Sequence, residues 1–141
     1  MFLLKGTVVG TWFNSIAKIY GQNVLEDALN EYGWPISRII TPLEDIADED
    51  PFKIVEIVAK RVGKNTSEIW RAIGQSNAFS FYEAYPSYFE RDNLRDFLLM
   101  MDEVHAQLTR KIPGANPPRL IPTKLEPKQI ELHYISKRGL F

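Results

Sequence analysis

The stretch from Leu94 to Leu108 constrains the fold most, because it places a single histidine on an otherwise apolar stripe. Helical spacing brings the stripe onto one face, and its members are Leu94, Phe97, Leu98, Met101, Val104, His105 and Leu108. Pro113-Gly114 follows, so we expect the helix to end near Ile112. Any fold of this chain must cover an apolar helix face that includes an imidazole.

The imidazole of His105 admits two interpretations. An unpartnered polar group on a buried face costs about 1–3 kcal/mol, so this side chain needs a partner. It is either a core histidine bonded to a backbone carbonyl or a metal or haem ligand that faces an apolar cavity. Nothing within the helix decides between the two.

The segments on either side of this helix differ in their periodicity. Upstream, helices are expected over residues 4–20, 23–32, 50–62 and from the capping box at 65–68 onward. Downstream of Pro117-Pro118 the pattern alternates, which predicts strands over 119–125 and 129–138. A helical N-terminal part, a long histidine-bearing helix and a small antiparallel sheet together predict the α+β fold class.

The last expected strand carries a polar row. Alternation places Tyr134, Ser136 and Arg138 on one face, while His133 lies on the other. Three donors about 7 Å apart in succession suit a carboxylate or a phosphate. An edge strand whose end emerges into solvent explains the row as well, and both interpretations stay open.

Composition excludes several classes of function. A net charge of −1 over 141 residues gives no electrostatic reason to expect nucleic acid. No apolar run approaches the ~20 residues that span a bilayer, and we expect a cytoplasmic protein. The chain has no cysteine, so disulfides, thiolate metal sites and iron–sulfur clusters are absent.

Haem b needs an axial nitrogen, apolar walls and hydrogen-bond donors for its two propionates. The chain offers an imidazole on an apolar face and a row of donors, with a double proline between them. The chain resembles the haem–nitric oxide/oxygen binding (H-NOX) domain, related to the sensor domain of soluble guanylate cyclase. The segments that carry the resemblance are KGTVVGTW (5–12), ITPLEDI (40–46), NxxEIWRxIGxxN (65–77), YPSYF (85–89), FLLMMDEVHAQLT (97–109), PGANPPRL (113–120) and HYISKRG (133–139).

The resemblance implies a role for each matching residue. His105 would be the axial ligand of the haem iron, and the haem packing residues would be Pro118, Met101, Val104 and Leu108. The haem propionates would be bound by Tyr134, Ser136 and Arg138. The distal pocket, where the gas binds, would be lined by Val8, Trp12, Asn77 and Phe81.

The resemblance also implies a gas sensor and no catalysis. Nitric oxide, oxygen or carbon monoxide would bind ferrous haem, and release of the histidine helix together with haem relaxation would signal to a partner. Partners of the family are histidine kinases, cyclic-di-GMP enzymes and chemotaxis receptors. Two alternatives remain from the residues themselves: a peroxidase-like haem enzyme and a cofactor-free interaction module.

The resemblance further implies one sensor domain over residues 1–141, with a distal helical subdomain at 1–64 and a proximal subdomain at 65–141. We expect the domain to continue past residue 141, where the distal tyrosine of oxygen-binding members would fall. Trp12 and Asn77 match the residues that support this tyrosine, which favours an oxygen-capable subset. The choice between nitric oxide and oxygen is left open.

Overall fold

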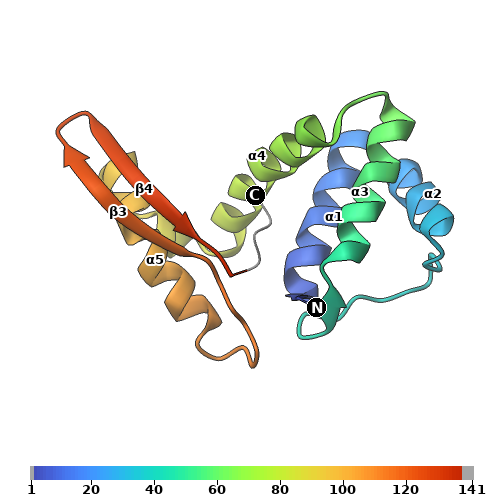
Figure 1. The fold of residues 1–141 in the computed structure, drawn as a ribbon, viewed down its shortest axis with the longest axis horizontal. Helices are drawn as coiled ribbons and strands as arrows, with labels where there is room; N and C mark the ends of the chain where they lie inside the picture. The colour runs from blue at the N-terminus through green and yellow to red at the C-terminus, as the bar shows by residue number, and fades with distance from the viewer. Residues whose placement is uncertain (1, 138–141) are drawn as a thin grey trace. The chain divides into compact units, whose positions relative to one another are not determined.

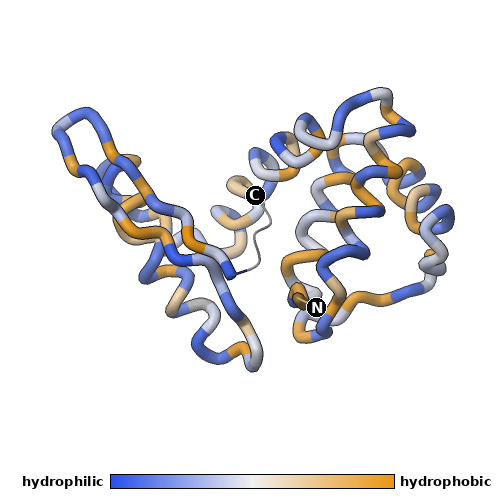
Figure 2. The backbone as a smooth tube through the Cα atoms, in the orientation of Figure 1, coloured by the Kyte–Doolittle hydropathy of each residue, from blue (hydrophilic) through white to orange (hydrophobic). Residues whose placement is uncertain are grey.

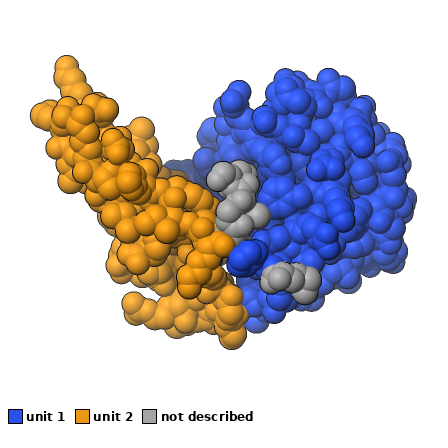
Figure 3. Space-filling view, in the orientation of Figure 1, with its two compact units in different colours: residues 1–84 blue, residues 85–141 orange. Residues whose placement is uncertain are grey.

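The computed structural model describes residues 2–137, and this part of the chain forms five α-helices and two small antiparallel sheets (Figure 1). The predicted α+β fold class is confirmed. The chain divides into two compact units, residues 1–84 (unit 1) and residues 85–141 (unit 2) (Figure 3). Within residues 2–137, no helix combines the length and apolar character needed to cross a membrane.

Unit 1 is a helical bundle with one two-stranded sheet. Its elements are β1 (Leu3–Lys5), α1 (Gly6–Tyr20), α2 (Gln22–Tyr32), β2 (Asp45–Ala47), α3 (Glu49–Val62) and α4 (Thr66–Ala84). The first residues of the expected first helix instead form β1, because they pair antiparallel with β2. This pairing joins segments that are distant in sequence, so the local pattern could not reveal it.

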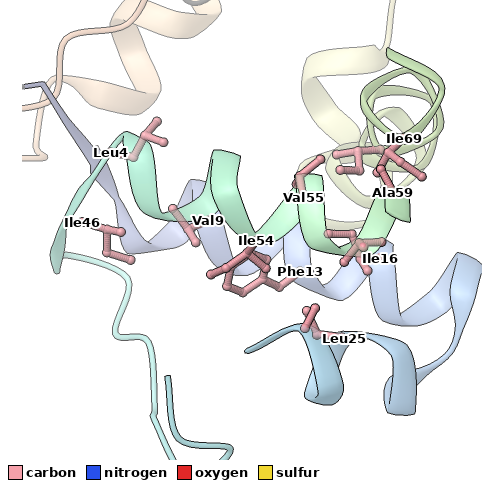
Figure 4. Packing of buried hydrophobic residues seen from close by; sticks show 13 residues of the cluster. Leu4, Val9, Phe13, Ile16, Leu25, Ile46, Ile54, Val55, Ala59 and Ile69 are labelled. Carbon is pink, nitrogen blue, oxygen red and sulfur yellow. The ribbon is translucent and has the colours of Figure 1, made fainter. Parts of the chain in front are cut away.

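The core of unit 1 lies where α1, α2, α3 and α4 meet (Figure 4). The fully buried residues of this core are apolar and recur at helical spacing along each helix. They include Val9, Ile16, Ile54, Val55, Val58, Ile69 and Ile73. Burying an apolar side chain of this size contributes about 1.5–3 kcal/mol, so this cluster accounts for the compactness of unit 1.

The boundary between the compact units lies after α4, and the distal and proximal subdomains expected at 1–64 and 65–141 stay a prediction. The structure places α4 in unit 1. Ile69 and Ile73 of α4 are buried in the core of unit 1, which explains why this helix belongs with the preceding ones.

Most helix ends follow the sequence signals. Gly33 and Gly63 end α2 and α3 in the left-handed conformation, with φ of 97° and 67°. At the capping box, the Asn65 N–H donates to Glu68 Oε2 (3.0 Å) and the Glu68 N–H donates to Asn65 Oδ1 (2.9 Å).

Gly6 is required by a close approach of the backbone. A Cβ at this position would lie 2.0 Å from the carbonyl oxygen of Thr41. The Gly6 N–H donates to the Glu44 carbonyl (2.8 Å), so the loop before β2 closes over the start of α1. Two separate segments of the resemblance, residues 5–12 and 40–46, therefore pack together.

Unit 2 consists of a short 3₁₀ turn, one long helix and a hairpin. These are η1 (Pro86–Phe89), α5 (Leu94–Thr109), β3 (Arg119–Glu126) and β4 (Gln129–Ile135). Asn93 caps α5 by accepting from the Asp96 N–H (3.0 Å). The helix ends at Thr109 instead of Ile112, because the chain continues in turns held by bonds such as Ile112 N–H to Thr109 C=O (2.9 Å).

The hairpin pairs β3 and β4 in antiparallel register, with Leu120 opposite Tyr134 and Pro122 opposite Leu132. Polar and apolar residues interleave along both strands, as Figure 2 shows. The face that carries Ile130, Leu132 and Ser136 is partly buried, whereas the opposite face is exposed. Tyr134 lies on the partly buried face by alternation but is itself 48% exposed, so the two-residue periodicity predicted the sides of β4 only in part.

Candidate functional site

The apolar stripe of α5 is only partly covered by the part of the chain that the structure describes. Among the described residues of the helix, Val104 alone is buried, with 5% of its surface exposed. Phe97, Leu98 and Met101 are half-buried on the same stripe. A soluble domain normally closes its apolar helix faces, so this stripe suits a further apolar group.

His105 lies in the middle of this stripe and is half-buried. Its Nδ1 is buried and has no hydrogen-bond partner among the described residues. Burial lowers the pKa of His105, and the Pro118 carbonyl and the Asp102 carboxylate oppose this with smaller effects. The imidazole is therefore mainly neutral at pH 7, the form that can bind a metal.

A single imidazole cannot hold a bare metal ion. Sites for such ions use about three or four protein ligands, and no group of three His, Cys, Asp or Glu side chains suited to a metal occurs in the part of the chain that the structure describes. One histidine is enough when a porphyrin supplies the remaining ligands. The neutral imidazole and the half-covered apolar stripe therefore fit a haem.

Pro118 and the polar row lie in the same unit as His105. Pro118 is half-buried directly before β3, and its carbonyl interacts with the imidazole. Ser136 is half-buried just after β4, and Tyr134 within β4 is 48% exposed. Arg138 lies outside the described residues, as does the side chain of Leu108.

One polar contact beside His105 was missed by the sequence analysis. Asp102 of α5 accepts two hydrogen bonds from Arg119 Nε (2.8 and 3.0 Å) and one from Arg119 Nη2 (2.7 Å). Its Oδ1 also accepts from the Leu120 N–H (2.9 Å). The only signal in the sequence was the position of Asp102 three residues before the histidine, since both lie on one helix face at this spacing.

The four candidate distal residues all lie in unit 1. Val8 and Trp12 are on one face of α1, and Asn77 and Phe81 are on one face of α4. Trp12 packs edge-on against Trp70 of α4, with ring centroids 4.9 Å apart. The structure thus brings the α1 and α4 faces together, whereas Phe81 is 43% exposed.

Asn77 is held by a second contact between the same helices. The Ser15 hydroxyl donates to its Oδ1 (2.9 Å), and Ser15 is 2% exposed. The amide group of Asn77 is therefore oriented, with its NH₂ as the remaining donor. No local pattern in the sequence points to the residues that contact these side chains. Phe52 and Trp70 pack against the ring of Trp12, and Ser15 binds Asn77.

Comparisons with known proteins agree with this chemistry. The model of the haem-NO-binding family matches residues 5–141. A crystal structure of an oxygen-binding H-NOX domain related to soluble guanylate cyclases, in its oxygen complex, is 48% identical with a TM-score of 0.84 and is matched over 96% of this chain and 72% of that chain.

Two mutant H-NOX structures are similar to the same extent. A mutant from T. tengcongensis is 48% identical with a TM-score of 0.88, over 96% of this chain and 74% of that chain. A Cs H-NOX mutant with 4-cyano-L-phenylalanine is 48% identical with a TM-score of 0.89, and the match covers 96% of this chain and 74% of that chain. No match was found among curated proteins.

Proposed function

The chain belongs to the haem-NO-binding family, and from this premise we propose that it senses a diatomic gas through a haem b held by His105. H-NOX domains are haem-based sensor domains. The observation that carries the proposal is the half-buried imidazole of His105 on an incompletely covered apolar helix face, where burial lowers its pKa. We propose further that residues 1–141 act together as a sensor domain.

Haem b, when bound, supplies an iron with an open position for the gas and two propionates that need donors. His105 would hold the iron. Pro118, Met101, Val104 and Leu108 would pack against the porphyrin, and Tyr134, Ser136 and Arg138 would bind the propionates. The half-burial of Met101 and Pro118 beside His105 supports the first set, and the shared strand face supports Tyr134 and Ser136.

Nitric oxide is the gas we propose first, with oxygen and carbon monoxide as further ligands. The candidate distal residues are Val8, Trp12, Asn77 and Phe81. A bound oxygen molecule gains from a hydrogen-bond donor more than nitric oxide or carbon monoxide does. The Ser15 hydroxyl orients the amide of Asn77, and Asn77 matches a residue that supports the distal tyrosine of oxygen-binding members. We therefore propose that Asn77 contributes to oxygen binding by holding such a hydrogen-bond donor in place.

Signalling would depend on His105 as a two-state element. Gas binding that weakens the bond to His105 would free α5, and the changed position of this helix would be read by a partner protein. A histidine kinase, a cyclic-di-GMP enzyme or a chemotaxis receptor is the class of partner we propose.

The visible absorption spectrum of the reduced, haem-reconstituted protein tests the proposal. We expect the Soret band of a five-coordinate histidine-bound ferrous haem, and we expect that band to shift when nitric oxide is added. Absence of a Soret band after reconstitution would contradict the haem assignment and favour a cofactor-free module. Turnover of peroxide at the rate of a peroxidase would instead favour an enzyme.

A further inference from the structure

Asp102 joins helix α5 to the first residues of the hairpin. Its carboxylate accepts from both the Arg119 guanidinium and the Leu120 backbone N–H, so it binds one side chain and one main-chain group of the same strand. The guanidinium contact is bidentate, which fixes direction as well as distance. The beginning of β3 therefore cannot rotate about α5 while these bonds are intact.

This contact has little to do with holding the unit folded. The Arg119 side chain is 63% exposed, and an ion pair in that environment is screened by solvent and adds little stability. Its geometric consequence is larger, because Pro118 directly precedes the two residues that Asp102 holds. Asp102 thus fixes the chain at the point where the Pro118 carbonyl interacts with the His105 imidazole.

Metal-binding histidines commonly have one ring nitrogen oriented by a backbone carbonyl or a carboxylate, and this outer partner sets the ring's tautomer and direction. Pro118 offers such a carbonyl: it acts on the imidazole without satisfying the buried Nδ1, and it lies in an irregular segment after the turn at Gly114 (φ 71°). Such a segment needs an anchor to keep its carbonyl in place. Asp102 is the charged side chain that supplies the anchor, three residues before His105 on the same helix.

We propose that Asp102 is a positioning residue for His105: by holding Arg119 and the Leu120 amide it keeps the Pro118 carbonyl at the imidazole and so orients the ring. This inference rests on the proposed function for its consequence in haem binding. The orientation of the ring itself can be measured with or without haem.

The first measurement uses the full chain labelled with ¹⁵N in histidine. The chain contains two histidines, and His133, whose side chain is 60% exposed, serves as an internal reference. In the wild type we expect the ring-nitrogen shifts of His105 to show one dominant tautomer. Asp102→Asn should move these shifts toward those of His133, and Asp102→Ala should move them further, because Asn can still accept from the Leu120 N–H.

The second measurement uses the haem-reconstituted, reduced protein. Loss of an outer partner typically weakens metal binding about 10- to 100-fold. We therefore expect Asp102→Asn to accelerate haem transfer to excess apomyoglobin about tenfold. The iron–histidine stretching band in the resonance Raman spectrum should shift to lower frequency.

Two control variants match the change. Glu103→Gln removes the same charge from the neighbouring residue, whose carboxylate contacts Gln107 of its own helix (2.9 Å). Arg95→Ala removes a different contact between α5 and the hairpin, from Arg95 Nη1 to the carbonyls of Glu126 and Gln129. Arg95 is ten residues from His105, or ~15 Å along the helix. Neither control should alter the His105 shifts.

The outcomes separate the inference from the proposed function. Unchanged His105 shifts in both Asp102 variants would overturn the positioning role, as would equal changes in Arg95→Ala. If the wild type binds no haem, the proposed function fails, but the nitrogen shifts of the haem-free chain still decide whether Asp102 orients the ring. A normal Raman band in Asp102→Asn would leave the haem assignment intact and overturn the positioning role.

Discussion

At the scale of single residues, His105 determines what the chain can bind. Its side chain is half-buried on the apolar stripe of α5, and burial lowers its pKa, so the ring keeps a free lone pair at neutral pH. A neutral side chain with one nitrogen to offer fits a metal that needs a single ligand from the protein. The other histidine, His133, is exposed and lies beside Glu131.

We predict that His105→Gly abolishes haem binding and that free imidazole restores part of it, because the small ligand can occupy the space of the lost ring. Loss of the ligand itself should weaken binding by more than the ~100-fold that loss of an outer partner can cost. Haem titration followed by the Soret absorbance measures the effect. His133→Gln is the control, and equal weakening in both variants would contradict the ligand assignment.

A second prediction at this scale concerns pH. Arg119 and the Leu120 N–H lower the pKa of Asp102 to about 2, well below the ordinary value of an aspartate. Because the pKa of Asp102 is lower in the folded state, the small stabilising effect of this exposed contact is fully present above pH ~4 and is lost as the pH falls through about 2. The chemical shift of the Leu120 amide proton, followed by NMR, should show this midpoint.

Asp102→Asn should remove that transition, since an amide does not titrate in this range. A midpoint near 4 in the wild type would mean that the carboxylate is not held by Arg119 and Leu120 in solution.

At the scale of elements, the ends of the helices are set by local hydrogen bonds that the sequence displays. Asn65 and Glu68 satisfy each other's backbone N–H groups at the start of α4. The bond that the Glu68 carboxylate accepts from the Asn65 N–H is the main cause that lowers the pKa of Glu68. The cap places Ile69 and Ile73 in register to enter the core of unit 1.

We predict that Asn65→Ala lowers the free energy of unfolding of unit 1 by about 1 kcal/mol, because the Glu68 N–H loses its acceptor. All three tryptophans, Trp12, Trp34 and Trp70, lie in unit 1, so their fluorescence during urea unfolding reports this unit. Ser67→Ala is the matched control at an exposed neighbouring position. An equal loss in both variants would show that the cap contributes nothing specific.

At the scale of the whole molecule, buried apolar residues are distributed unevenly between the units. The cluster of buried core residues belongs to unit 1, whereas Val104 is the one buried apolar residue among the described residues of unit 2. Protein interiors are normally closely packed, so the apolar stripe of α5 gains stability from any apolar group that covers it.

We predict that hydrogen exchange of the haem-free protein is slow in α1, α3 and α4 and faster in α5, because opening α5 exposes little buried surface. Haem should slow exchange in α5, with a smaller effect on the core of unit 1. Exchange measured by mass spectrometry with peptide resolution tests this. Equally slow exchange in both units before haem is added would contradict the interpretation of the stripe.

The amino-acid sequence alone determined the features that depend on near neighbours. The ends of α2 at Gly33 and of α3 at Gly63, the cap at Asn65 and the turn between the two strands of the hairpin follow from bonds within a few residues. The second strand was expected to reach residue 138, but β4 ends at Ile135. The stripe with His105 also belongs to this class, since helical spacing alone places it on one face. The sequence motifs that resemble the H-NOX domain predicted the family correctly.

Only the tertiary structure decided the contacts between distant segments. Three contacts join residues that no local pattern connects. They are the pairing of β1 with β2, the hydrogen bond from Ser15 to Asn77 across 62 residues, and the ion pair between Asp102 and Arg119. The boundary after α4 also depended on the way Ile69 and Ile73 enter the core. Local periodicity specifies which face of an element is apolar, but the path of the chain decides which partner that face meets, because the energy of burial does not depend on sequence distance.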